Sequence, residues 1–257
     1  MKIWAHRGCS QCYPENTITS FEKAMSIPGL EGIELDIQLT RDGEMVVIHD
    51  ERVDRTTDGR GYVRDYTLSE LKTLKIDAGE GRTEHIPTMR EVFDLLSPKL
   101  SEYVNNGQSG NGIRLNIELK NGVFPYPGME KMIVDMVDEY GVADAIVYST
   151  FYAKSLTLLH ELVPDAQLGM LDPRLSDCMY KARGIEAMYS DTKLALHPGA
   201  GCIDLPASVL TGRTVRMYFS GHLYPEKPTP GKMDLDKLAA TGVTDVFLNE
   251  PEKYLTD

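Results

Sequence analysis

The sequence predicts an α/β protein that folds as a (β/α)8 TIM barrel in one domain over residues 1–257. Short apolar runs alternate with longer segments of helical period, which implies parallel strands joined by helical crossovers. One strand candidate follows its neighbour through a tight turn, so it must pair antiparallel. Eight strands remain, and eight strand–helix units suit a chain of 257 residues. An open doubly wound sheet is the alternative, but the glycine-rich dinucleotide fingerprint is absent after the first strand.

The strand candidates are short apolar runs separated by polar or helical segments. The eight barrel strands are expected at Ile3–His6, Ile33–Leu39, Arg114–Lys120, Ala145–Thr150, Gln167–Leu171, Leu194–His197, Val215–Phe219 and Val246–Leu248, with the antiparallel strand at Met45–His49. Helical spacing or capping residues occur at Asn16–Met25, Thr67–Leu74, Met129–Tyr140 and Leu235–Thr241. We interpret the long polar stretch Glu51–Pro87 as a small insertion over the barrel mouth.

The antiparallel strand also predicts a cluster of functional side chains. Asp42-Gly43 is a strong signal for a two-residue hairpin loop, because both central positions of a type I′ turn need positive φ. With that turn, Asp36 lies directly across from His49, and Glu34 shares the face of Asp36 because residues two apart on a strand do so. We therefore predict two carboxylates and an imidazole close together. Such a group is costly to assemble without a metal ion or a charged substrate.

Further charged residues stand at the predicted carboxyl ends of strands, where barrel enzymes carry their active sites. His6 and Arg7 end the first strand. Glu118 and Lys120 end another, and their spacing puts both on one face. Each residue taken alone also fits a structural role, such as a hydrogen-bonded histidine or a simple ion pair. The predicted fold, however, brings all of them to the same rim.

The charges of this rim indicate a metal ion and a phosphodiester. Its three acids and two cations give −3 and +2, so a divalent cation changes the net charge from −1 to +1, which matches a phosphodiester monoanion. Carboxylate oxygens suit Mg²⁺ or Ca²⁺. Arg7 is suited to hold phosphate oxygens in a fork, with Lys120 as a point charge. His6 and His49 are candidates for acid–base exchange near neutral pH.

The bulk composition limits the partners. The net charge of −12 argues against a nucleic-acid-binding surface and against adhesion to anionic membranes. No apolar run approaches the length of a membrane span and the N-terminus lacks a long apolar region, so we expect a soluble cytoplasmic protein. The pair Cys9 and Cys12 has the spacing of a redox motif or half a zinc site, although no second pair completes such a site.

Several short motifs resemble the glycerophosphodiester phosphodiesterase family in order and in spacing. They are His6-Arg7-Gly8, Pro14-Glu15-Asn16-Thr17, Glu34-Leu35-Asp36, Asp42-Gly43, His49-Asp50, Thr57-Asp58-Gly59, Ile86-Pro87-Thr88 and Ile117-Glu118-Leu119-Lys120. The resemblance implies a (β/α)8 barrel with a small insertion after the hairpin histidine. It also implies hydrolysis of glycerophosphodiesters to glycerol 3-phosphate and an alcohol, with one divalent metal ion.

The resemblance also implies a role for each matching residue. Metal ligands would be Glu34, Asp36 and Glu118; the acid–base pair would be His6 and His49; phosphate contacts would be Arg7 and Lys120. A lysophospholipase D acting on lipid-linked glycerophosphodiesters is the alternative enzyme. A non-catalytic barrel that binds phosphodiesters is the alternative from another class.

Two late segments depart from the family pattern. Tyr218-Phe219-Ser220-Gly221 stands where a Trp-Thr-Val-Asn run is common, and Asn249-Glu250-Pro251 stands where an Asp-Arg-Pro type of sequence is common. Tyr218 is either an aromatic wall for the glycerol or alcohol side, or a core aromatic with a satisfied hydroxyl. These departures bear on the identity of the substrate more than on the reaction.

Overall fold

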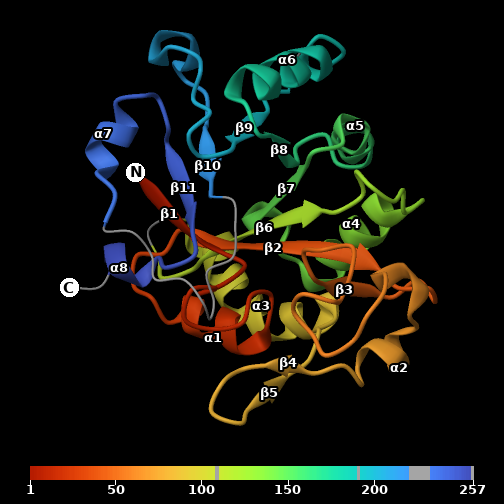
Figure 1. The fold of residues 1–257 in the computed structure, drawn as a ribbon. Coiled ribbons are helices and arrows are strands. Elements are labelled where there is room, and N and C mark those ends of the chain that lie inside the picture. The colour runs from red at the N-terminus through yellow and green to blue at the C-terminus, as the bar shows by residue number, and fades with distance from the viewer. Residues whose placement is uncertain (108–109, 190–191, 220–231, 256–257) are drawn as a thin grey trace.

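Eight parallel strands form the barrel in the computed structural model, which describes residues 1–107, 110–189, 192–219 and 232–255. The strands are β1 (Lys2–His6), β2 (Gly32–Leu39), β6 (Arg114–Leu119), β7 (Ile146–Thr150), β8 (Gln167–Asp172), β9 (Ala195–Pro198), β10 (Arg216–Tyr218) and β11 (Asp245–Leu248). Neighbours follow the order β10-β11-β1-β2-β6-β7-β8-β9 (Figure 1). Parallel bridges from Leu196 to Val215 and from Gly199 to Tyr218 join β9 to β10. The barrel prediction is therefore confirmed, and the open sheet is wrong.

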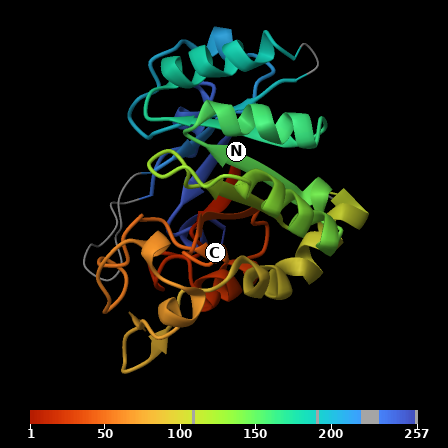
Figure 2. The same cartoon turned by 90° about the vertical axis from the view of Figure 1, so that its right-hand side faces the viewer.

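Helices surround the strands on the outside (Figures 1 and 2). They are α1 (Ile18–Met25), α2 (Leu68–Leu71), α3 (Met89–Asn106), α4 (Met129–Tyr140), α5 (Ala153–Leu162), α6 (Leu175–Glu186), α7 (Leu235–Ala239) and α8 (Glu252–Leu255), with 3₁₀ turns at Val63–Asp65, Ala143–Ala145 and Ala207–Leu210. The hydroxyls of Thr17 and Thr88 accept hydrogen bonds from the first turns of α1 and α3, which fixes where these helices begin. No helix among the described residues is long and apolar enough to cross a membrane.

The core has two parts that together support the site. Apolar side chains between the strands and the helices form the main core. Inside the barrel, Trp4, Val147 and Phe247 pack together below the charged rim, with the Trp4 and Phe247 rings edge to face. Trp4 needs Gly32 beside it, because a Cβ at position 32 would lie 2.5 Å from the indole ring. This apolar floor keeps the polar groups at the carboxyl ends of the strands.

The predicted register of the hairpin is wrong by one residue. Strand β3 (Met45–Val47) does pair antiparallel with β2, but Ile37 faces Val47, and the Ile48 amide donates to the Asp36 carbonyl. Asp36 is therefore opposite Ile48 and not opposite His49. The length of the hairpin loop causes this shift of one residue in the register.

The hairpin loop has three residues, because the Thr40 amide donates to the Glu44 carbonyl and the Glu44 amide donates to the Thr40 hydroxyl. Gly43 has a φ of 84°, whereas Asp42 is not among the residues with positive φ, so the loop is not the two-residue type I′ turn. Met45 and Val47 then pack into the main core, whereas Val46 and Ile48 pack against the segment that follows. Both faces of β3 are thus apolar, and alternation along this strand could not reveal the register.

Residues 51–87, the proposed insertion, carry short elements of their own. They contain α2 and the two-stranded sheet of β4 (Ile76–Asp77) and β5 (Thr83–Glu84), which projects from the edge of the barrel (Figures 1 and 2). Val53, Val63 and Leu71 form a small apolar cluster with the outer face of β3. This segment therefore packs beside the strand end that leads to His49.

Candidate functional site

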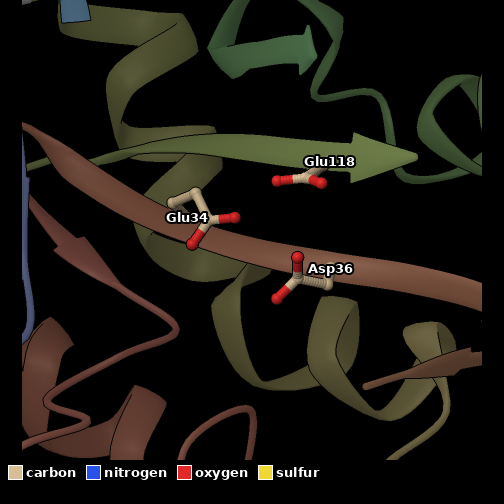
Figure 3. A group of neighbouring side chains, drawn as sticks. All are labelled: Glu34, Asp36 and Glu118. Atoms are coloured by element: carbon tan, nitrogen blue, oxygen red, sulfur yellow. The ribbon is translucent and has the colours of Figure 1, made fainter. Parts of the chain in front are cut away.

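Three buried carboxylates meet at the carboxyl ends of β2 and β6. Asp36 and Glu118 are partners in the parallel register of these strands, and Glu34 precedes Asp36 by two residues. Figure 3 shows the three side chains gathered between the two strands. One oxygen from each lies within 4.8 Å of the others. The sequence prediction that these three acids share one place is confirmed.

The donor set fits a hard divalent cation. Burial, followed by the negative charges of Asp36 and Glu118, raises the pKa of Glu34 well above its usual value. Asp36 Oδ1 is buried and has no hydrogen-bond partner among the described residues. A buried carboxylate oxygen without a hydrogen bond, beside two further carboxylates, is costly, and Mg²⁺ or Ca²⁺ would offset that cost. The cluster offers only oxygen ligands, which favours these ions over zinc.

Two cations flank the acids. Arg7 Nε lies 3.4 Å from Asp36 Oδ2, and Lys120 Nζ lies 2.9 Å from Glu118 Oε1. Burial alone would lower the pKa of Lys120, but Glu118 and Asp36 outweigh it, and the net effect is a raised pKa. Burial alone would raise the pKa of Asp36, but electrostatic interactions with His49 and Arg7 outweigh it and lower that pKa. Arg7 has a φ of 57°, a strained conformation that often marks functional sites.

His6 stands at the end of β1, almost fully buried. Its Nδ1 lies 2.7 Å from Asn249 Oδ1, and its Nε2 lies 3.8 Å from Glu34 Oε2. Burial, and then the charge of Arg7, lower the pKa of His6 to about 3. The ring is therefore neutral at pH 7. Its Nδ1–H donates to the amide oxygen of Asn249, which leaves the Nε2 lone pair available on the other edge.

His49 reaches the same pocket from the hairpin although the predicted register is wrong. Strand β3 ends at Val47, so the strand's alternation no longer determines the direction of the His49 side chain. Its Nδ1 lies 2.7 Å from Asp50 Oδ1, and its Nε2 lies 3.2 Å from Lys120 Nζ. An ammonium group can only donate, so Nε2 accepts and Nδ1–H donates to Asp50.

A chain of ion pairs joins His49 to Arg7. Arg55 donates to both carboxylate oxygens of Asp50, at 2.6 and 3.0 Å, and to both of Glu15, at 2.8 and 2.9 Å. Glu15 also accepts from Arg7, at 3.0 Å. Arg55 is not among the residues predicted for the site. Nothing in its local sequence distinguishes it, because its partners become neighbours only through the fold.

The pocket between the two histidines contains about 50 Å³ of open space. It is lined by His6, Arg7, Glu34, His49, Asn116, Glu118, Ser149, Phe151, Leu171, His197, Tyr218 and Phe247. Lys120 lines a second cavity that shares Glu118 and Phe151 with this pocket, and Asp36 is fully buried beside Arg7. The structure therefore brings every predicted site residue to one place. Tyr218 meets Phe151 edge to face, at 6.1 Å between ring centroids, and so forms part of an aromatic wall.

Two asparagines that hold site residues in place were missed by the sequence prediction. Asn249 directly follows β11 and holds His6, so the strand-end rule applied to the last strand would have found it. Asn16 donates from Nδ2 to Asp36 Oδ2, at 2.9 Å, and has a φ of 56°. Its place in the motif Pro14-Glu15-Asn16-Thr17 was the available signal. Of the late segment compared with Trp-Thr-Val-Asn, Ser220 and Gly221 lie outside the described residues.

The cysteine pair does not form a second site in the described part of the chain. Cys9 is buried and Cys12 is exposed, and both are free thiols. Burial, and then a hydrogen bond to Glu252, raise the pKa of Cys12 to about 11. A thiol with a raised pKa is a poor nucleophile and a poor metal ligand. Among the described residues, the metal-ligand group contains only Glu34, Asp36 and Glu118.

Comparison with known proteins agrees with this geometry. The sequence model of the glycerophosphoryl diester phosphodiesterase family matches residues 6–178, which is more than half of the chain. This chain belongs to that family. The named members of the family are phosphoric diester hydrolases.

Individual relatives span different shares of the chain. A glycerophosphodiester phosphodiesterase of Caldanaerobacter subterraneus is 43% identical over 66% of this chain, and the match covers 65% of that relative, slightly less than two thirds. One of Bacillus subtilis is 33% identical over 97% of this chain and 84% of its own length. The solved structure of an Oleispira antarctica phosphodiesterase in complex with the product sn-glycerol-3-phosphate is 26% identical. It covers 98% of this chain and 94% of that one, with a TM-score of 0.73.

Proposed function

We propose that this protein hydrolyses glycerophosphodiesters to glycerol 3-phosphate and an alcohol, with one divalent cation and two histidines. The observation that carries the proposal is one small pocket lined by His6, His49, Arg7, Glu34 and Glu118. Asp36 and Lys120 lie directly against these residues, at 3.4 Å from Arg7 and 2.9 Å from Glu118. A phosphodiester needs each of these: positive charge for its oxygens, a base for the nucleophile and an acid for the leaving alcohol.

Glu34, Asp36 and Glu118 are the proposed ligands of Mg²⁺ or Ca²⁺. When bound, the ion would supply positive charge that polarises a phosphoryl oxygen and offsets charge in the transition state. The buried Oδ1 of Asp36, which accepts no hydrogen bond from a described residue, supports this assignment. The choice between the two ions depends on coordination number and on how rigid the site is.

The remaining residues bind the phosphate and move protons. Arg7 is proposed to hold phosphate oxygens through its fork, and Lys120 to contribute a further positive charge. One histidine removes the proton from the nucleophile and the other protonates the leaving oxygen, in both cases through Nε2. The nucleophile is water, or a glycerol hydroxyl that first gives a cyclic phosphate. Phosphorus NMR of the products distinguishes these two routes.

The bound product of the Oleispira antarctica phosphodiesterase supports a small glycerophosphodiester as substrate. The charged and hydrogen-bonding groups that line the pocket suit the phosphate and glycerol part of such a molecule. From the net charge of −12 we expect no nucleic-acid partner, and we expect a cytoplasmic protein, as the sequence indicates.

The deciding experiment measures turnover of glycerophosphocholine, glycerophosphoethanolamine and lysophospholipids with Mg²⁺, with Ca²⁺ and with chelator. We expect hydrolysis of the first two that depends on the metal ion and releases glycerol 3-phosphate. Preference for lysophospholipids would instead support a lysophospholipase D. Metal binding without turnover of any of these substrates would support a non-catalytic barrel that binds phosphodiesters.

A further inference from the structure

A second cavity continues from the catalytic pocket toward the surface. Its volume is about 340 Å³, and Glu118 and Phe151 line both cavities. Glu51, Val123 and Tyr152 form its outer walls. The groove, as we call this cavity, is thus open to solvent at one end and to the site at the other. A part of the substrate that does not fit the small pocket can extend into it.

The walls of the groove combine aromatic rings with an acid. Tyr152 is 42% exposed and Val123 is 64% exposed, so apolar surface is available there. Glu51 makes no side-chain hydrogen bond or ion pair with any residue that the structure describes. A cation without N–H donors is attracted both by ring faces and by a carboxylate, and quaternary ammonium ligands are bound in this way. The groove therefore matches a methylated ammonium group.

Lys120 also lines the groove, but its charge is offset. Its Nζ lies 2.9 Å from Glu118 Oε1 and 4.0 Å from Asp36 Oδ1. The same Nζ lies 5.8 Å from the centroid of the Phe151 ring, which shows that this wall accommodates a cation. Glu51 and Tyr152 therefore remain available for a second cation farther out.

The groove begins beside one of the proposed acid–base groups. Lys120 Nζ lies 3.2 Å from His49 Nε2, and Lys120 itself lines the groove. An alcohol must leave the phosphorus close to a group that can protonate its oxygen. The groove is therefore positioned to hold the alcohol side of the phosphodiester.

We propose that this groove is the subsite for the alcohol and that it selects a quaternary ammonium head group, as in choline, over a neutral polyol. The proposal rests on the proposed function. Glu51 and Tyr152 are the specificity-determining residues. A polyol would leave the Glu51 charge unpaired, and an acyl chain would place hydrocarbon against that charge.

The test compares two substrates that differ only in the head group, glycerophosphocholine and glycerophosphoglycerol. For Glu51→Gln we expect kcat/KM for glycerophosphocholine to fall about threefold to tenfold, the size of a partly exposed ion pair or cation–π contact. Glycerophosphoglycerol should be cleaved as before. Tyr152→Leu keeps an apolar wall but removes the ring, and it should show the same selective loss. Glu22→Gln, an exposed position on α1, is the matched control for net charge.

Other outcomes overturn the proposal. An equal loss of kcat/KM for both substrates means that Glu51 and Tyr152 do not select the head group. A gain in lysophospholipid turnover by Glu51→Gln means that the groove holds an acyl chain. Choline titration of the metal-loaded protein, followed by NMR, tests the groove without turnover. Choline binding that Glu51→Gln weakens supports the subsite even if no diester is cleaved, and absent binding contradicts it.

Discussion

His6 and His49 approach the same pocket with opposite surroundings. The side chain of His6 is 7% exposed, and its Nδ1 donates to a neutral amide, that of Asn249. The side chain of His49 is 28% exposed, and its Nδ1 donates to the carboxylate of Asp50. Both arrangements fix the tautomer and leave Nε2 on the pocket side. One histidine is held by burial between β1 and β11, and the other is held by ion pairs.

This difference bears on what each partner can contribute. A neutral amide orients the ring and sets its tautomer, whereas a carboxylate also stabilises positive charge that develops on the ring during proton transfer. The carboxylate of Asp50 is in turn held by Arg55, which continues through Glu15 to Arg7. The His49 side of the pocket is therefore connected to Arg7, the proposed phosphate ligand, and the His6 side is connected to the barrel core.

The largest expected effect comes from removing either ring. His6→Ala and His49→Ala should each lower kcat about 10²–10⁴-fold if both move protons. The double variant should lose little more than the worse single variant, because residues that act as a unit are not additive. Steady-state kinetics with the metal-loaded protein measures this. Near-normal turnover of either single variant would remove that histidine from the mechanism.

The partners of the two rings provide the next comparison. Asp50→Asn should lower kcat about 10–100-fold, the usual cost of removing a partner that orients a functional group. Asn249→Ala should cost less, because burial still holds His6 in place. Asp54→Asn, which changes an exposed ion pair with Arg52, is the matched control for charge. If Asn249→Ala proves the more harmful change, the carboxylate does not have the role inferred here.

A smaller effect should follow from the link between the two sides. Arg55→Gln leaves both Glu15 and Asp50 without their bidentate partner, and we expect kcat/KM to fall about tenfold, the size of a partly exposed charged pair with several hydrogen bonds. Arg55→Lys should recover little of this, because a point charge cannot bridge two carboxylates as a fork does. A loss confined to kcat, with KM unchanged, would mean that Glu15 and Arg7 are positioned without Arg55.

Much of this site could be predicted because strand ends in a barrel converge. To predict that the three acids lie together, it was enough to know where the strands are and that side chains two apart share a face. Both are properties of local sequence, and they apply to Glu34, Asp36 and Glu118. The register of the hairpin needed more. Asp42-Gly43 indicated a turn, but whether its loop has two or three residues depends on which faces of β3 are buried, and both are.

The contacts that could not be predicted are those between segments brought together by the closed barrel. Asn249 meets His6 from the far end of the chain, 243 residues away. Arg55 lies in the proposed insertion, and its ion pairs depend on how that segment packs on the hairpin. Side-chain length and direction decide such pairs, and neither follows from spacing along one strand.

The smallest expected effect is on stability in acid, and it should differ between Asp50, the partner of His49, and Asn249, the partner of His6. Burial would raise the pKa of Asp50, but the hydrogen bonds from His49 and Arg55 outweigh it and hold the pKa well below the usual value of 3.8. A lowered pKa in the folded state stabilises the protein above about pH 4, and the stabilisation is lost as the pH falls below that.

At pH 7 Asp50→Asn should therefore lower the Tm by about 2–4 °C, for a pair worth about 1 kcal/mol in a chain of this size. The difference in Tm between Asp50→Asn and the wild type should narrow between pH 4 and pH 3. Asn249→Ala removes no charge, so its difference in Tm should not change with the protonation of Asp50. Thermal unfolding across that pH range measures both, and parallel curves for the two variants would show that Asp50 contributes no charge-dependent stability.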